Sequence, residues 1–134
     1  MDRIIKIRSI AIAVLLISIA VFISGCSKEI NQEDIIGKFT ANHDQGIDTL
    51  EIRTDGTYIH EFKSNEKSFI NTDKWEFEKN DGKPVLTLSG FIAGFSDYGP
   101  KEPGFLYLAV ERRVFSNIKL YINIDMGRYY EKDV

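Results

Sequence analysis

The stretch LEIRTDGTYIHEF, residues 50–62, decides the fold class of this chain. Apolar and polar residues alternate on both sides of Asp55-Gly56, which is the pattern of two half-buried strands joined by a turn. An Asp-Gly pair between two alternating runs is a strong signal for an antiparallel hairpin. Residues 50–62 therefore predict a β-hairpin that turns one face toward a protein core.

The register of this hairpin decides where His60 points. A two-residue turn would pair Ile52 with Ile59 and turn His60 outward, because a shift of one residue moves every side chain to the other face. A longer turn with Gly56 in the left-handed conformation would pair Ile52 with Tyr58. We favour this bulged register because it places two aromatic side chains inside. Its inner face would then consist of Leu50, Ile52, Tyr58, His60 and Phe62.

The rest of the chain continues the strand pattern. Further strands are predicted near residues 38–41, 75–78, 85–89, 105–114, 118–124 and 128–131. About eight strands with short connections predict an all-β fold, an antiparallel meander that curls into a small barrel or sandwich. The pair Tyr129-Tyr130 we expect at an edge of the sheet rather than in a site.

The alternation within KWEFE, residues 74–78, predicts core positions. We expect Trp75 and Phe77 to face the core together with Leu86 and Leu88 of the following strand. Before the first strand, Asn31 is followed three residues later by Asp34, which is the spacing of a capped helical turn. A short helical turn is therefore predicted just ahead of the sheet.

The first 25 residues have the composition of a secretory signal. Arg3, Lys6 and Arg8 precede residues 10–23, which carry no charge and a single polar side chain, Ser18. This apolar run is shorter than the roughly 20 residues that span a bilayer core. We expect residues 1–25 to be a helical signal peptide, residues 26–36 a tether with the short helical turn, and residues 37–134 the β-barrel domain.

The signal ends on the only cysteine of the chain. Ile23-Ser24-Gly25-Cys26 resembles the lipobox of bacterial lipoproteins. The resemblance implies cleavage before Cys26, a diacylglycerol on its sulfur, and an acyl chain such as palmitate on the new N-terminus. Two alternatives stay open: an incidental thiol after an ordinary signal peptide, and an uncleaved membrane anchor.

The same resemblance implies a location on the exported side of a membrane. In a Gram-negative cell, Ser27 stands where inner-membrane lipoproteins typically carry aspartate, which implies anchoring in the outer membrane. In a Gram-positive cell the protein would lie on the outer face of its cell membrane. Residues 26–134 carry 14 basic and 19 acidic side chains. This net charge of −5, without a basic patch, makes nucleic acid an unfavourable partner.

Three stretches carry a resemblance that covers most of the exported chain. Residues 37–39, 50–58 and 74–77 resemble small bacterial lipocalin-like lipoproteins, many of which have no assigned function. The resemblance implies a small lipocalin-like barrel and brings no catalytic residues with it. Phe39 stands where lipocalins carry the tryptophan of their Gly-x-Trp opening.

Two histidines are the best candidates for a catalytic or metal-binding side chain. His60 is interpreted either as a hydrogen-bonded structural residue or, less favourably, as a catalytic residue acting with an acid. His43 lies in residues 41–46, which read as a surface loop. The two histidines could meet an acid at a metal, but their spacing does not support this, and neither a metal nor another cofactor is predicted. No nucleophile or phosphate-binding motif is present, so we expect no enzyme.

Residues 90–104 form the longest irregular stretch, with two prolines and four glycines. Long loops in compact domains are often functional. Phe95 and Tyr98 either cap one end of the barrel as part of a structural crossover, or belong to a lid or a partner-binding loop.

The sequence-based hypothesis for function is a binding module anchored in the cell envelope. Its partner would be another envelope protein, or a small apolar or glycan-like ligand at the barrel mouth. The expected contact residues are Tyr58, His60, Phe95 and Tyr98. The first alternative is an inhibitor or immunity-type lipoprotein that blocks an enzyme at the cell surface. The second is an enzyme that uses His60.

Overall fold

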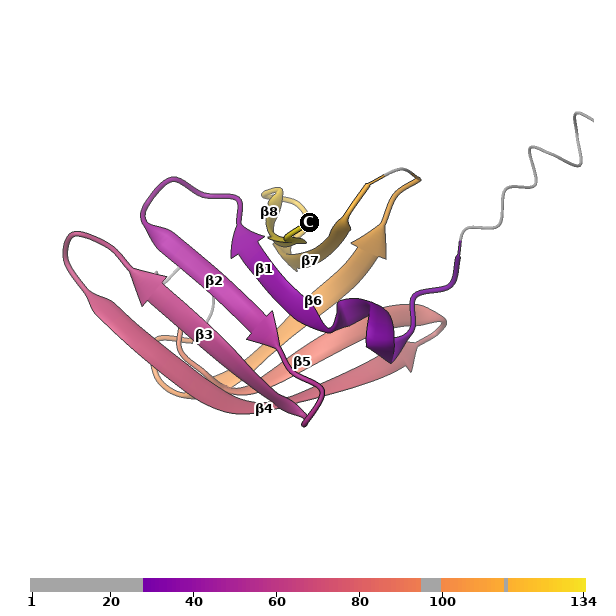
Figure 1. Ribbon diagram of the computed structural model, residues 1–134, viewed down its shortest axis with the longest axis horizontal. Coiled ribbons are helices and arrows are strands. Elements are labelled where there is room, and N and C mark those ends of the chain that lie inside the picture. Colours follow the sequence, from indigo (N-terminus) through magenta and orange to yellow (C-terminus); the bar gives the residue numbers. More distant parts are fainter. Residues whose placement is uncertain (1–27, 95–99, 115) are drawn as a thin grey trace, which may run out of the picture.

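The computed structural model describes residues 28–94, 100–114 and 116–134, and it shows a closed barrel of eight antiparallel strands (Figure 1). Each strand pairs with the next along the chain, and the last pairs with the first. The predicted all-β meander of about eight strands is confirmed. No helix in these ranges is long and apolar enough to cross a bilayer. The elements are the 3₁₀ turn η1 (Gln32–Ile35) and the strands β1 (Gly37–Ala41), β2 (Ile47–Ile52), β3 (Thr57–Lys63), β4 (Ser68–Asn80), β5 (Lys83–Phe91), β6 (Gly104–Arg112), β7 (Ile118–Asn123) and β8 (Arg128–Lys132).

The β2–β3 hairpin adopts the bulged register. Ile52 pairs with Tyr58, and Gly56 has a φ of +84°, a conformation that residues with a Cβ rarely adopt. The carboxylate of Asp55 holds the turn, because it accepts hydrogen bonds from the Thr57 amide at 2.9 Å and the Thr57 hydroxyl at 2.6 Å. The predicted inner face is therefore confirmed. Its five buried members are Leu50, Ile52, Tyr58, His60 and Phe62.

Strand β4 is much longer than the sequence pattern predicts. Its first half pairs with β3 and its second half with β5, so that one bent strand joins two parts of the wall. Only residues 75–78 were expected to be extended, because the segment SFINTDK before them shows too little apolar alternation. Asn71 in this segment has a structural task instead. Its amide donates to the Gly90 carbonyl at 2.7 Å and closes the wall where the β4–β5 ladder stops.

The core lies inside the barrel and is mostly apolar. Trp75 pairs with Leu88 and Phe77 with Leu86, and all four face inward as predicted, although Phe77 is only partly buried. The indole of Trp75 donates to the Arg53 carbonyl at 2.9 Å, which satisfies its single polar group. Full burial of a large apolar side chain contributes roughly 1.5–3 kcal/mol.

The short turn η1 closes one opening of the barrel. The amide of Asn31 donates to the Asp34 carboxylate at 2.9 Å, which confirms the predicted capped turn in its 3₁₀ form. This turn directs Ile35 into the barrel, where its side chain is fully buried in the main core cluster. Ile30 and Ile36 pack against the same cluster.

The strands alternate in direction, so the barrel has two ends with different connections (Figure 1). We call the end with η1, the β2–β3, β4–β5 and β6–β7 connections and the C-terminus the tether end. We call the opposite end, with the β1–β2, β3–β4, β5–β6 and β7–β8 connections, the loop end. The expectation that Tyr129-Tyr130 lies at a sheet edge is wrong. Strand β8 pairs with β7 on one side and β1 on the other, because closure of a barrel leaves no edge.

Candidate functional site

A buried carboxylate lies near the loop end of the barrel. Asp48 is only 4% exposed, although aspartate is almost never buried without partners. Its position follows from strand geometry: Asp48, Leu50 and Ile52 alternate along β2 and therefore point to the same, inner face. The burial of Asp48 thus requires hydrogen-bond donors inside the barrel.

Three side chains from different parts of the chain supply these donors. His60 Nε2 of β3 lies 2.9 Å and the Tyr130 hydroxyl of β8 lies 2.8 Å from Asp48 Oδ1. His43 Nε2 of the β1–β2 connection lies 3.0 Å from Asp48 Oδ2. The amide of Gln45 donates to His43 Nδ1 at 3.3 Å, which assigns the proton of neutral His43 to the nitrogen that faces Asp48. We call Asp48, His43, His60 and Tyr130 the Asp48 network.

The Asp48 network keeps its carboxylate ionised. Burial alone would raise the pKa of Asp48, because a low-dielectric environment penalises the charge. The hydrogen bond and charge of His60 lower the pKa, and the hydrogen bonds of His43 and Tyr130 lower it further. The pKa of Asp48 therefore lies below its usual range. The net direction means that the donors outweigh the cost of burial. Asp48 is therefore a fixed negative charge that holds three elements together.

His60 is enclosed on its other sides by aromatic rings. Its side chain is 0% exposed, stacks on Phe91 with ring centres 4.4 Å apart and meets the edge of Phe69 at 5.6 Å. In the part of the chain that the structure describes, Nδ1 has no hydrogen-bond partner. With Nε2–H directed at Asp48, Nδ1 is a bare acceptor in an apolar surrounding. This enclosure fits the interpretation of His60 as a hydrogen-bonded structural residue.

His43 differs from its sequence-based interpretation. The residue lies in a connection between strands, as predicted, but its side chain is only 7% exposed and bonds to Asp48. The residues next to it are exposed, as expected of a surface loop, but the His43 side chain itself turns toward Asp48. In residues 28–94, 100–114 and 116–134, no group of three or more His, Cys, Asp or Glu is arranged to hold a metal ion.

Tyr58 belongs to a second polar contact inside the barrel. Its hydroxyl donates to the Ser89 carbonyl at 2.6 Å and accepts from the Asn71 amide at 3.3 Å. Burial raises the pKa of Tyr58, and the nearby charge of Asp73 raises it further, while the Asn71 bond acts in the opposite direction. The hydroxyl therefore stays protonated and seals the wall beside Gly90.

Of the four predicted contact residues, two are placed by the structure. Tyr58 and His60 are fully buried, so a ligand could reach them only if the loop end opened. Phe95 and Tyr98 lie outside the described residues. A role of these four side chains in binding stays a prediction.

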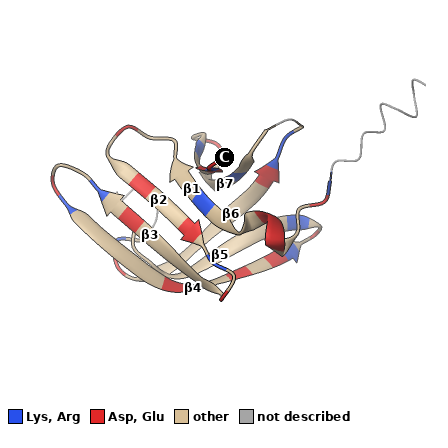
Figure 2. Cartoon of the chain, in the orientation of Figure 1, with Lys and Arg blue, Asp and Glu red and all other residues tan. Residues whose placement is uncertain are grey.

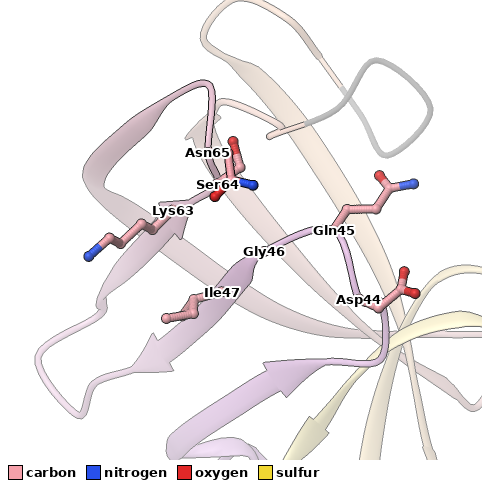
Figure 3. A pocket seen from close by; sticks show the side chains of 7 residues that line it. All are labelled: Asp44, Gln45, Gly46, Ile47, Lys63, Ser64 and Asn65. Atoms are coloured by element: carbon pink, nitrogen blue, oxygen red, sulfur yellow. The ribbon is translucent and has the colours of Figure 1, made fainter.

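An open groove lies at the loop end (Figure 3). It has a volume of about 500 Å³ and runs between the β1–β2 connection and the β3–β4 turn. Gly46 lets these two segments approach each other: its φ is +144°, and a Cβ there would overlap the carbonyl oxygen of Lys63. The residues that line the groove are Asp44, Gln45, Gly46, Ile47, Lys63, Ser64 and Asn65.

The Asp48 network also shapes one wall of this groove. His43 and Asp48 flank the groove residues 44–47, and the bond between their side chains closes this segment into a loop. The bond from the Gln45 amide to His43 Nδ1 fixes the segment from inside. A groove whose wall is already held in place loses less conformational entropy when it binds a ligand.

Sequence reasoning missed two of the four network residues. The alternation that placed Leu50 and Ile52 inside also places Asp48 inside, but the strand was expected to begin only at residue 50. Tyr130 had no local signal, because its contact with Asp48 joins residues 82 positions apart. Comparison of the chain with protein-family models, curated proteins and solved structures finds no match.

Proposed function

We propose that the protein is a lipid-anchored lipoprotein of the bacterial cell envelope whose barrel serves as a binding module. The observation that carries the anchor is the sequence Ile23-Ser24-Gly25-Cys26 after a charge-free apolar run. It supplies the chain's only thiol at the position where a lipoprotein is acylated. The barrel begins soon afterwards, with β1 at Gly37.

The groove at the loop end is the best candidate for the contact surface of this module. It is concave, has a volume of about 500 Å³, and combines an apolar residue, Ile47, with the charged and amide groups of Lys63 and Gln45. Ligand sites typically combine a concave shape with a few polar groups that fix orientation. Its partner would be an envelope protein segment or a small glycan-like ligand, since both offer polar groups to such a lining.

One alternative is an inhibitor or immunity-type lipoprotein that blocks an enzyme at the cell surface. It would use the same loop end, but its partner would lose activity when bound. A second alternative is an enzyme that uses His60 with Asp48, since a carboxylate on one ring nitrogen and a bare second nitrogen is a general-base arrangement. The 0% exposure of His60 argues for the binding module over this enzyme.

The anchor is tested by the mass of the mature protein. The wild-type chain should begin at Cys26 and carry two or three acyl chains, because two such chains already give stable membrane attachment. Cys26→Ser should leave the precursor uncleaved by the lipoprotein route, and the variant should carry no acyl chains. An unmodified Cys26 thiol in the mature wild-type protein would overturn the anchor.

The contact surface is tested by site-specific crosslinking in the producing cell. A photoreactive amino acid at Gln45 or Asn65 should capture a discrete partner, whereas the same amino acid at Lys83, at the tether end, should not. Lys83 is a matched control because it is also an exposed polar residue next to a turn. Equal capture from all three positions, or capture from Lys83 alone, contradicts a binding groove at the loop end.

A further inference from the structure

The chain leaves the barrel at the tether end. Glu29 bonds to Lys79 at the end of β4, with 2.6 Å between the carboxylate and the ammonium group. Ile30 packs against the core cluster. A shallow concavity of about 310 Å³ brings residues 28–30 together with the β4–β5 turn and the last residues of β6. In Figure 1 the described chain begins at the same end of the barrel as the β4–β5 connection.

The segment between the anchor and the barrel is short. Lys28 is two residues from Cys26 and Ile30 is four residues from it. A fully extended residue spans at most about 3.6 Å, so Cys26 lies within roughly 7 Å of Lys28 and roughly 14 Å of Ile30. Strand β7, with 6 residues, is about 20 Å long at 3.3–3.4 Å per residue. A barrel held on such a segment cannot turn its loop end toward the surface that holds Cys26.

The tether end offers side chains that suit the surface of a bilayer. Val114 in the β6–β7 connection is 76% exposed, and its neighbour Arg113 is exposed as well. Lys28 and Lys83 are exposed at the same end. Aliphatic side chains flanked by cations fit the boundary between acyl chains and phosphate headgroups.

Acidic side chains at this end are partly neutralised. Figure 2 shows basic and acidic residues side by side there. Glu29 is paired with Lys79, and Asp34 lies 3.2 Å from the guanidinium of Arg112. Glu33 and Asp81 are exposed. The charge of the tether end is therefore mixed, and the short segment after Cys26, rather than net charge, determines its orientation.

We propose that the tether end lies against the phospholipid surface, with Val114 and Arg113 at the level of the headgroups. The inference rests on the proposed acylation of Cys26 and adds the orientation of the barrel to it. The loop end with the groove and the Asp48 network then points away from the membrane, toward partners in the surrounding space. The occupant of the tether end is a lipid bilayer, because the anchor leaves no room for a protein partner there.

A pair of fluorescent probes tests this orientation. Val114→Cys and Met126→Cys each place one thiol in a connection next to β7, at the tether end and the loop end respectively. Both residues are exposed apolar side chains, at 76% and 55%, so neither change should disturb the core. The sulfur of acylated Cys26 does not react, so an environment-sensitive dye labels the new thiol alone. The full-length acylated protein is reconstituted in vesicles of phosphatidylethanolamine and phosphatidylglycerol.

Spin-labelled lipids in these vesicles should quench the dye at position 114 several-fold more strongly than the dye at position 126, with a blue shift at 114 only. Equal quenching at both positions, or stronger quenching at 126, overturns the orientation. The mass of each protein separates this result from failure of the anchor. A non-acylated chain would carry dye on Cys26 and would not stay with the vesicles, which contradicts the proposed function itself.

Discussion

The two ends of the barrel bury side chains to a similar extent but by different interactions. At the tether end, Trp75 is 6% exposed and packs in an apolar cluster that also contains Ile35. At the loop end, Asp48 is 4% exposed and is held by hydrogen bonds from His43, His60 and Tyr130. The first environment is stabilised by loss of apolar surface from water, which has no direction. The second depends on donors at fixed distances and angles.

This difference separates apolar packing at the tether end from a fixed hydrogen-bond geometry at the loop end. Apolar packing closes the tether end, where the chain enters the barrel. In the Asp48 network, a buried charge fixes the geometry of the loop end. Its hydrogen bonds hold the β1–β2 connection, β3 and β8 together beside the groove. A buried ionised group is weak evidence for stability but can specify one arrangement of the chain. We therefore expect changes in the apolar cluster that contains Trp75 and Ile35 to act on stability alone. Changes in the Asp48 network should act on stability, on pH response and, if the proposed function holds, on binding.

The largest effect should come from the apolar end. Trp75→Ala removes a buried aromatic ring, which typically costs about 3–5 kcal/mol of a total unfolding free energy of about 5–15 kcal/mol. Urea unfolding followed by circular dichroism measures this loss. Trp75→Phe is the matched control and should lose less, since it keeps a ring and gives up the bond to the Arg53 carbonyl. Native fluorescence of a water-exposed tryptophan in the wild type would contradict this placement.

The next largest effect should come from the polar end. Asp48→Asn keeps the size of the side chain but replaces one acceptor oxygen by a donor group. At least one buried donor of the network then lacks an acceptor, which costs about 1–3 kcal/mol. Urea unfolding at neutral pH measures this loss, and amide exchange should rise in residues 42–47 but not in η1. Uniform exchange changes at both ends would contradict a local role of the network.

The acid response should distinguish the two ends. The pKa of Asp48 is lowered in the folded protein, so its contribution to stability is complete above the usual carboxyl pKa of about 3.9 and is lost as the pH falls through the folded value. Unfolding free energies between neutral pH and pH 3 should therefore decrease less steeply in Asp48→Asn than in the wild type. Trp75→Ala should keep the slope of the wild type. Identical slopes in all three proteins would assign the acid response to other carboxylates.

A smaller effect is expected from a single donor of the network. Tyr130→Phe removes the hydroxyl that lies 2.8 Å from Asp48 and keeps the ring, at a cost of about 1 kcal/mol. In the Asp48→Asn background the same change should cost less, because the carboxylate is already absent. A double-mutant cycle measures this coupling. Strict additivity of the two changes would show that the hydroxyl acts independently of Asp48.

The smallest effect should come from the outer face. Tyr107 of β6 is exposed, and Tyr107→Ser should change the unfolding free energy by no more than about 0.5 kcal/mol. Its melting curve provides the baseline against which both ends are compared. A loss as large as that of Asp48→Asn would mean that the outer face is packed against another surface in solution.

Much of the fold could be predicted because it follows from local patterns. Alternation around Asp55-Gly56 predicts the hairpin, and the preference for two aromatic side chains inside favours the register that turns His60 inward. The strand that contains Trp75 follows from the same period of two. These features depend on residues a few positions apart, and the chain geometry alone relates them. The first half of β4 escaped prediction because residues 68–74 show too little alternation, and their pairing with β3 depends on the partner strand.

What the sequence by itself determined is the class of the fold, whereas acylation at Ile23-Ser24-Gly25-Cys26 before it stays a prediction. The tertiary structure alone decided that Asp48, His43, His60 and Tyr130 meet, and that β8 has no free edge. Closure of the barrel brings the first and last strands together, so that Tyr130 reaches a carboxylate 82 residues earlier. Local propensity contains no information about such a contact. A buried charge needs hydrogen-bond donors around it, and only the closed barrel brings the donors of Asp48 together.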